Sequence, residues 1–261
     1  MMPRKGYVTG PTGQIHYRTL GNGIPLILSH QSPSSSNMFQ GVYSLLAEAG
    51  IMAIGVDTPG FGMSDVPNRR PSVADYATMF IPIMEKFGLD KANFLGHHTG
   101  ACNVCEFSVQ YPQRVAKLIL NGPPLFSSEE RAQRIDKPRA LPIESDGSHL
   151  KTLWDRRCAA TPGYSDLDAM QKGVMQTLWA GETAWYGHKA AYEYDMIPSF
   201  QSIVVPTLIL TNTGDDLYDI SRQAHAIRPD MDYTELDDGT HDIIDEQPED
   251  WTDVVVAYLK H

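Results

Sequence analysis

The chain has 261 residues, 42% of them hydrophobic, which is enough for one large domain with a buried core and room for an inserted subdomain. Its 32 acidic side chains outnumber the 21 basic ones, and the net charge of −11 argues against sequence-independent binding to nucleic acid or to an anionic membrane. The first residues lack the apolar core of a signal peptide, and no apolar run is long enough to span a bilayer, so we expect a cytoplasmic protein.

The first part of the chain alternates strand and helix patterns. Residues 7–9 and 14–20 predict two strands joined by a Gly-Pro-Thr-Gly turn, as in a hairpin. The apolar runs at 25–29 and 51–56 are typical of strands that are covered on both faces. Residues 37–50 between them predict a helix. The two apolar runs therefore indicate two buried strands.

A further helix is predicted over residues 72–87. Ser72 is a suitable N-cap, and Pro82 should kink the helix or end its first half, because proline cannot donate the backbone hydrogen bond of a helix interior. This helix precedes the most informative turn of the chain.

The sequence G-H-H-T-G at residues 96–100 joins the end of a buried strand, 93–95, to a helix over 101–111. This is the spacing of a nucleophile elbow, in which the middle residue has a strained backbone and an exposed side chain, and the glycines allow strand and helix to approach closely. The middle residue here is His98, where the pattern G-x-S-x-G places serine. The turn therefore predicts the elbow geometry with an altered chemistry.

The second half of the chain changes character twice. After a strand pattern at 115–120, residues 125–200 contain helix-like segments rich in Trp, Tyr and Met and no buried strand signal. The earlier alternation then returns as strand 204–210, helix 220–227, strand 233–236 and helix 249–259. We therefore expect an α/β fold with a doubly wound, mostly parallel sheet, in which 1–124 and 201–261 form the core and 125–200 a helical cap.

Four motifs resemble the α/β-hydrolase fold superfamily, and the resemblance covers nearly the whole chain. They are H-Q-S-P at 30–33, D-T-P-G-F-G-M-S at 57–64, the elbow, and Asp215 followed by His241, which keep the family's order of nucleophile, acid and histidine. The chain departs from the family at two positions. Gln31 stands where glycine is usual, and His98 replaces the serine, cysteine or aspartate nucleophile.

The resemblance implies roles for several site residues. Asp215 would accept a hydrogen bond from one ring nitrogen of His241, the general base, whose other nitrogen would face the elbow. The backbone N–H groups of Ser32 and Thr99 would form the oxyanion hole. His30 would be structural, closing a hydrogen bond within its loop. The expected site is therefore a triad with histidine in the nucleophile position.

Two neighbours of the elbow have simpler explanations. His97 should point away from the site if the elbow is regular. Cys102 and Cys105 form a C-x-x-C, but the surrounding pattern is not the start of a thioredoxin-like βαβ unit, so we do not expect a redox role.

The substrate pocket is expected between cap and sheet, lined in part by cap aromatics. Candidate substrate contacts are Gln31, Trp154 and Trp179. We expect a small-molecule substrate and no cofactor. Imidazole and carboxylate are good zinc ligands, but a site made of His98, His241 and Asp215 would take Asp215 from its orienting position, so no metal is expected.

Histidine at position 98 leaves three mechanisms open. His98 could attack directly as a nucleophile. His98 and His241 could flank one water or substrate hydroxyl, one as base and one as acid, because two nearby imidazoles disfavour double protonation and push their pKa values apart. The chain could also be a non-catalytic small-molecule binder, although a binder has no chemical need for Asp215 and His241.

We favour the second mechanism, in an enzyme that hydrolyses an ester, a lactone or an activated C–C bond of a small apolar molecule. The enzymatic alternative is a cofactor-independent lyase, isomerase or cyclase that uses the same two histidines for proton transfer.

Overall fold

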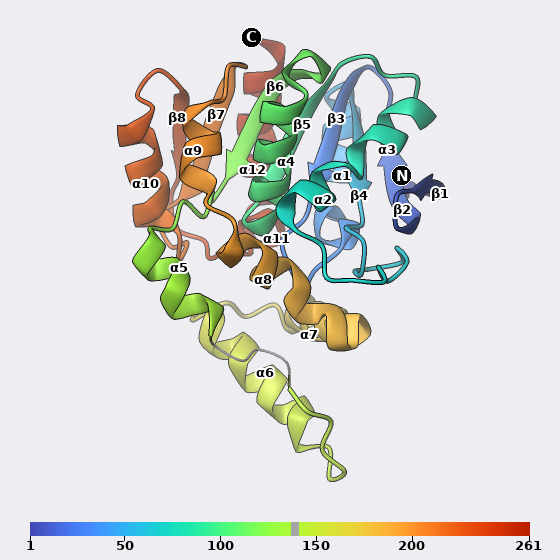
Figure 1. The fold of residues 1–261 in the computed structure, drawn as a ribbon, viewed down its shortest axis with the longest axis vertical. Coiled ribbons are helices and arrows are strands. Elements are labelled where there is room, and N and C mark those ends of the chain that lie inside the picture. Colours follow the sequence, from blue (N-terminus) through green and yellow to red (C-terminus); the bar gives the residue numbers. More distant parts are fainter. Residues whose placement is uncertain (137–140) are drawn as a thin grey trace.

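The computed structural model describes residues 1–136 and 141–261 and shows a sheet flanked by helices (Figure 1). The eight strands lie in the order β1-β2-β4-β3-β5-β6-β7-β8. The first two pairings are antiparallel and the other five are parallel, which confirms the predicted fold class. The strands are β1 (Arg4–Gly10), β2 (Gly13–Leu20), β3 (Ile24–Ser29), β4 (Ile51–Val56), β5 (Ala92–His97), β6 (Val115–Asn121), β7 (Thr207–Asn212) and β8 (Asp232–Leu236).

Two apolar clusters fill the two sides of this sheet. Ile27 belongs to one cluster, whereas its neighbours Leu26 and Leu28 belong to the other, because successive side chains of a strand point to opposite faces. In Figure 1, α4 (Thr99–Gln110) lies in front of the sheet and α12 (Pro248–Lys260) behind it. The continuous apolar runs of the central strands are therefore explained by burial on both faces. The other core helices are α1 (Tyr43–Glu48), α2 (Val73–Ala77), α3 (Phe80–Lys86), α10 (Tyr218–Ile227) and α11 (Ile243–Glu246).

The helix predicted over 72–87 is divided into α2 and α3. Ser72 and Asp75 form a capping box at the start of α2, as the N-cap prediction requires. The division falls at Thr78 and Met79, before Pro82, which lies in the first turn of α3. Proline is tolerated there because the first N–H groups of a helix have no intrahelical acceptor.

Among its described residues, the connection from β6 to β7 contains helices and loops but no strand. Met196 and Phe200, near its end, belong to the same buried cluster as Cys102 of α4. The division into core and cap stays a prediction, and residues 137–140 of the predicted cap lie outside the described residues. The helices are α5 (Ser128–Ile135), α6 (Ser148–Ala160), α7 (Leu167–Ala180), the 3₁₀ helix η3 (Gly181–Trp185), α8 (Tyr186–Glu193) and α9 (Met196–Gln201). In Figure 1 the helices from α5 to α8 lie below the sheet, and α9 lies in front of the sheet beside α4.

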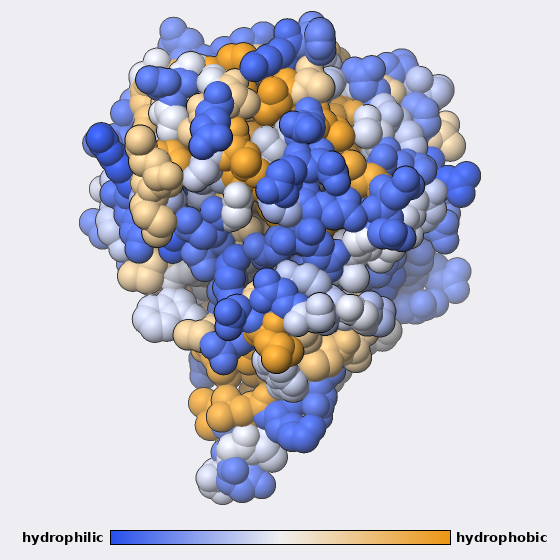
Figure 2. Space-filling model, turned by 180° about the vertical axis from the view of Figure 1, so that it is seen from behind, coloured by the Kyte–Doolittle hydropathy of each residue, from blue (hydrophilic) through white to orange (hydrophobic). Residues whose placement is uncertain are grey.

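The helix α6 projects furthest from the sheet. Seen from behind, hydrophilic and apolar side chains are mixed over the upper part of the molecule, and apolar side chains also lie on its narrow lower part (Figure 2). The exposed large apolar residues of α6 and α7 are Leu150, Leu167, Met175, Leu178 and Trp179. Within the described ranges, no helix has the length and apolar character needed to cross a bilayer.

The two cysteines of the C-x-x-C lie inside α4. Cys102 and Cys105 are fully buried free thiols. Burial raises the pKa of Cys102 to about 12 and that of Cys105 as well, so both thiols stay protonated. Their contribution is to packing, in agreement with the expectation that they have no redox role.

Candidate active site

The elbow has the backbone that its glycine spacing predicts. His98, between β5 and α4, has φ 48° and ψ −113°, in a region that residues other than glycine rarely adopt. A Cβ atom on Gly96 would lie 2.3 Å from the carbonyl oxygen of Gly100, and one on Gly100 would lie 2.2 Å from that of Ser29. Both glycines are therefore required by the close approach of strand and helix.

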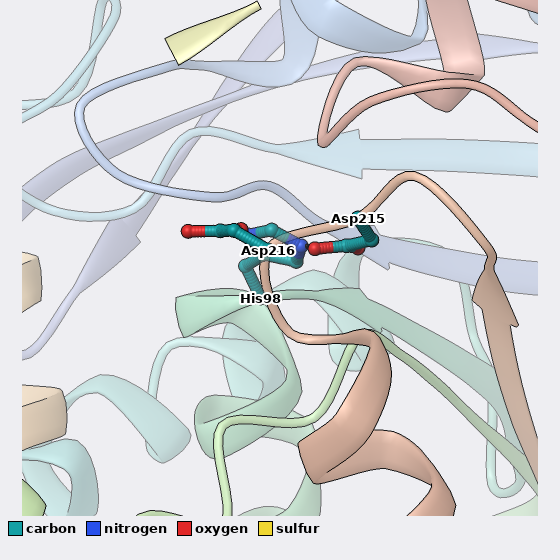
Figure 3. A group of neighbouring side chains, drawn as sticks. All are labelled: His98, Asp215 and Asp216. Carbon is teal, nitrogen blue, oxygen red and sulfur yellow. Dashed lines mark hydrogen bonds and ion pairs between the residues drawn. The ribbon is translucent and has the colours of Figure 1, made fainter.

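The side chain of His98 binds Asp215, which lies in the loop after β7. Nε2 of His98 donates to Oδ2 of Asp215 over 2.8 Å, and Oδ1 of Asp215 accepts from the Leu217 N–H over 2.8 Å. Figure 3 shows the Asp215 carboxylate directed at the imidazole, with Asp216 beside them. Since an ionised carboxylate can only accept, the neutral ring of His98 carries its proton on Nε2 and its lone pair on Nδ1.

The two partners shift each other's titration. Burial would raise the pKa of Asp215, but the charge and hydrogen bond of His98 hold it well below its usual range. Burial would lower the pKa of His98, but Asp215 above all, with Asp216 and Asp242, raises it above its ordinary value. The pair therefore behaves as a dyad in which the carboxylate orients the imidazole and stabilises its protonated form.

The expected hydrogen bond between Asp215 and His241 is wrong. An imidazole at the elbow is longer than a serine hydroxyl, so His98 reaches the carboxylate directly. It therefore takes the position beside Asp215 that was predicted for His241. Gly122, just after β6, makes this possible, because a Cβ there would lie 2.5 Å from Cδ2 of His98. Sequence reasoning missed this role of Gly122, although the glycine itself was a visible signal.

His241 is held instead by a cap residue. Nη1 of Arg157, on α6, donates to Nε2 of His241 over 2.9 Å, and the same guanidinium forms an ion pair with Asp242. The ring centroids of His98 and His241 are 6.3 Å apart. Burial, with the charges of His98 and Arg157, lowers the pKa of His241 despite the opposing Asp242. The two imidazoles thus have pKa values displaced in opposite directions, as expected for a close pair.

His97 lies underneath the site. Its ring is fully buried and stacked on that of His98 at a centroid distance of 4.3 Å, and its Nε2 donates to the backbone carbonyl of His241 over 2.9 Å. Burial and the neighbouring His98 lower its pKa to about 3. The prediction that His97 is not directed into the site agrees with this geometry, but its anchoring of the His241 loop was not foreseen.

His30 is structural, as predicted. Its Nδ1 donates to the carbonyl of Gln31 over 2.8 Å, and its Nε2 accepts from the Thr58 N–H over 2.9 Å. Burial lowers its pKa in spite of the nearby Asp57. Both ring nitrogens are therefore occupied in joining two loops at the carboxyl end of the sheet.

The candidate oxyanion hole is partly occupied by a side chain. The Ser32 N–H donates to Oγ1 of Thr99 over 2.8 Å. Thr99 is the first residue of α4, where backbone N–H groups have no intrahelical acceptor. Both predicted donors thus lie next to His98, but the Ser32 donor becomes available to a substrate only when the Thr99 hydroxyl turns away.

A cavity of about 700 Å³ lies between the elbow and the cap. Its wall includes His98, His241 and Gln31, and the substrate contact of Gln31 stays a prediction. Among the described residues that form the wall, the cap tryptophan is Trp185 and neither Trp154 nor Trp179.

Trp179 is instead 70% exposed, and its Nε1 donates to the carbonyl of Gly62. The structure shows a helical insertion in this part of the chain, but aromatic composition could not tell which face of each helix points inward.

One group of described side chains has the spacing of a metal site. Ligand atoms of His98, Asp215 and Asp216 all lie within 4.8 Å of one another. This set replaces the His241 of the zinc alternative by Asp216. Imidazole and carboxylates suit zinc, but two of these atoms, Nε2 of His98 and Oδ2 of Asp215, are already joined by a hydrogen bond.

Comparison with known proteins places the chain in a family. The family model described as alpha/beta hydrolase fold matches residues 24–248. A non-heme haloperoxidase of Rhodococcus erythropolis is 28% identical over 237 residues, which cover 84% of this chain and 85% of that protein.

Two solved structures illustrate the likeness of the fold. An esterase from Exiguobacterium antarcticum has a TM-score of 0.83 at 19% identity and covers 98% of this chain and 99% of its own. An enol-lactonase from Burkholderia xenovorans LB400 has a TM-score of 0.83 at 18% identity and covers 98% of this chain and 100% of its own. At these identities the structural likeness bears on the fold alone.

Proposed function

The chain belongs to the α/β-hydrolase fold family, and within it we propose that this protein hydrolyses an ester, a lactone or an activated C–C bond of a small molecule. The observation that carries the proposal is the 2.8 Å hydrogen bond between His98 and Asp215 on the strained elbow. The match of residues 24–248 to the alpha/beta hydrolase fold family supports a hydrolytic reaction.

In the proposed reaction His98 acts on water and forms no acyl-enzyme. Because Asp215 holds the proton on Nε2, the Nδ1 lone pair is the basic site of the ring. It accepts a proton from a water that attacks the carbonyl carbon, and the imidazolium that forms is stabilised by Asp215. The proton then passes from Nδ1 to the departing oxygen or carbon. Proton and charge are thus returned to the starting state after each turnover.

His241 serves as the second imidazole. Its lowered pKa keeps it neutral, and Arg157 occupies its Nε2, so its proton is on Nδ1. A neutral imidazole can donate a hydrogen bond to an oxygen that gains charge in the transition state. The 6.3 Å between the ring centroids matches one small group held between the two rings. We propose that this group is the attacked carbonyl oxygen or the attacking water.

The test is a kinetic comparison on a panel of aryl esters and lactones. His98→Ala should lower kcat/KM by on the order of 10² to 10⁴ with the fold preserved. His225→Ala is the matched control, because His225 stacks on Tyr233, outside the cavity wall, and it should keep parental activity. Full activity in His98→Ala would remove His98 from the chemistry.

His98→Ser separates water activation from covalent catalysis. A serine beside Asp215 and His241 restores the family's three residue types, so any activity that this variant gains should show a rapid burst of the first product. The parent should show no burst, since no acyl-enzyme accumulates. A burst in the parent that disappears in His98→Ala would instead identify His98 as the nucleophile.

A lyase, isomerase or cyclase is the second candidate, favoured by one observation. The Ser32 N–H is bound by Oγ1 of Thr99, so one oxyanion donor is withdrawn, whereas proton transfer between His98 and His241 does not require it. Thr99→Val has nearly the same shape and frees this N–H. An acyl-transfer enzyme should gain ester hydrolysis in the variant, and an enzyme of pure proton transfer should not. A binder without catalysis would show no turnover in any form while retaining ligand.

A further inference from the structure

Arg157 of α6 reaches from the cap into the core site. Its side chain is 16% exposed, and its guanidinium contacts two successive residues of the loop after β8. Nη1 donates to Nε2 of His241 over 2.9 Å, and Nη2 forms the ion pair with Asp242. One planar fork therefore binds an imidazole and a carboxylate at the same time, which a lysine ammonium cannot do with the same geometry.

A glycine in the neighbouring helix α7 leaves space for the side chain of Arg157. Gly173 lies within α7, where glycine weakens a helix. A Cβ atom at this position would lie 3.0 Å from Nε and 3.2 Å from Cζ of Arg157. The absence of a side chain at Gly173 thus leaves the guanidinium the space it needs to pass from α6 toward the core. The arrangement involves three segments and is more than a surface ion pair.

The hydrogen bond determines where His241 carries its proton. A guanidinium has no acceptor and does not lose its charge in proteins, so Nε2 of His241 can only accept. We propose that Arg157 is a positioning residue that fixes His241 as the tautomer with its proton on Nδ1, so that docking of α6 completes the acid-base pair of the core. This inference rests on the role of His241 in the proposed function.

The charges around His241 come from four segments. Asp242 on its own loop and Asp216 after β7 favour its protonation, whereas His98 on the elbow and Arg157 on the cap oppose it. Removal of Arg157 takes away one opposing charge and leaves Asp242 without its ion pair. Both changes favour the imidazolium, so the pKa of His241 should rise in a variant without the arginine.

The matched control is the second ion pair between the cap and this part of the core. Lys172 of α7 binds Asp245 over 3.1 Å, and each side chain is 24% exposed. This pair anchors the cap close to the same loop, and its hydrogen bonds go to Asp245 and not to the His241 ring. Lys172→Met therefore tests the effect of looser cap anchoring without changing the hydrogen bond at Nε2.

The experiment is nitrogen-proton correlation spectroscopy of the full chain labelled with ¹⁵N in its histidines. The His241 signals are assigned by their loss in His241→Gln. In the parent and in Lys172→Met, Nε2 should show the unprotonated form and Nδ1 the protonated form. In Arg157→Met the tautomers should mix, and the pKa of His241 should rise by about one unit or more, as is typical when a nearby charge is removed. No substrate is needed for this readout.

Arg157→Lys keeps the positive charge and the ion pair with Asp242 but not the fork. It should mix the tautomers with a smaller rise in the His241 pKa than Arg157→Met, and it serves also if Arg157→Met does not fold. An unchanged His241 spectrum in the arginine variants, or the same change in Lys172→Met, would overturn the proposal. An absence of turnover on every substrate would count against the proposed function. It would not change the spectroscopic evidence on the tautomer of His241.

Discussion

At the scale of single residues, the length of one side chain decides which pair forms at the site. The imidazole of His98 is long enough to reach Asp215 directly. A serine at this position would be too short, and a second histidine would have to lie between the two. His241 is then bound by Arg157, and His97 holds the carbonyl of the same residue. The acid and the histidine of the resembled triad are both present, but the acid binds the histidine at the elbow and not His241.

The raised pKa of His98 predicts the pH dependence of the reaction. The neutral ring is the base, so kcat/KM should rise with pH through a value above 6.5, the ordinary pKa of histidine. Asp215→Asn removes the charge that contributes most to this rise, so the variant should titrate at lower pH and turn over more slowly. A pH-rate profile of both proteins checks this, and an inflection below 6.5 in the parent would contradict it.

His97 predicts sensitivity to acid. Its pKa falls from 6.5 when unfolded to about 3 when buried, so its contribution is present above pH 6.5 and is lost as pH falls toward 3. His97→Gln keeps an N–H for the His241 carbonyl but does not titrate. Both proteins should lose stability between pH 7 and 4.5. The loss of unfolding free energy in His97→Gln should be smaller than that in the parent by about 2 to 3 kcal/mol. Urea titrations at both pH values measure this, and parallel losses would refute it.

At the scale of elements, the elbow was predictable because its constraint is local. Two glycines and a short apolar strand specify the turn regardless of what surrounds it. The contact of Arg157 with His241 was not predictable, because it depends on the direction in which α6 leaves the sheet. Arg157 lies among other charged residues of α6, and nothing in its immediate sequence distinguishes it from Arg156.

Gly173 allows a test at this scale. In an ordinary exposed helix, Gly→Ala stabilises by about 1 kcal/mol. Gly173→Ala should gain less than this, because its Cβ displaces the guanidinium of Arg157, and kcat/KM should fall by about tenfold, the equivalent of about 1.4 kcal/mol. Gly41→Ala, whose Cβ would meet nothing nearer than 3.9 Å, is the control. Equal activity of the two variants would contradict the proposed path of Arg157.

At the scale of the whole molecule, the alternation of buried strands was enough to predict the sheet and its helical layers. The helical insertion was predicted from its aromatic content and the lack of a strand signal. Its internal arrangement was not, because Trp154, Trp179 and Trp185 are equally apolar in sequence, and only the last lines the cavity among the residues that the structure describes. Composition locates a cap, whereas its inward face depends on tertiary packing.

The connection between β6 and β7 should contribute unevenly to stability. Phe200 on α9 is fully buried in the cluster that contains α4, whereas Leu150 on α6 is 47% exposed. Phe200→Ala should therefore lower the unfolding free energy by about 3 to 5 kcal/mol, and Leu150→Ala by less than about 0.5 kcal/mol. Denaturant titration measures both, and similar losses would show that the whole connection behaves as one unit.

Gly122 has a consequence for the order in which substitutions can accumulate. A methyl group at this position would lie 2.5 Å from the ring of His98, and the residue has φ +58°, so an alanine there is strained and also collides with the imidazole. With serine at position 98, the backbone strain and a 3.0 Å approach to Oδ2 of Asp215 would remain, but the collision with the imidazole would not. Gly122→Ala should thus be far more damaging beside His98 than in the His98→Ser background. If this elbow arose from one with serine at position 98, residue 122 must have been glycine before the serine was replaced by histidine.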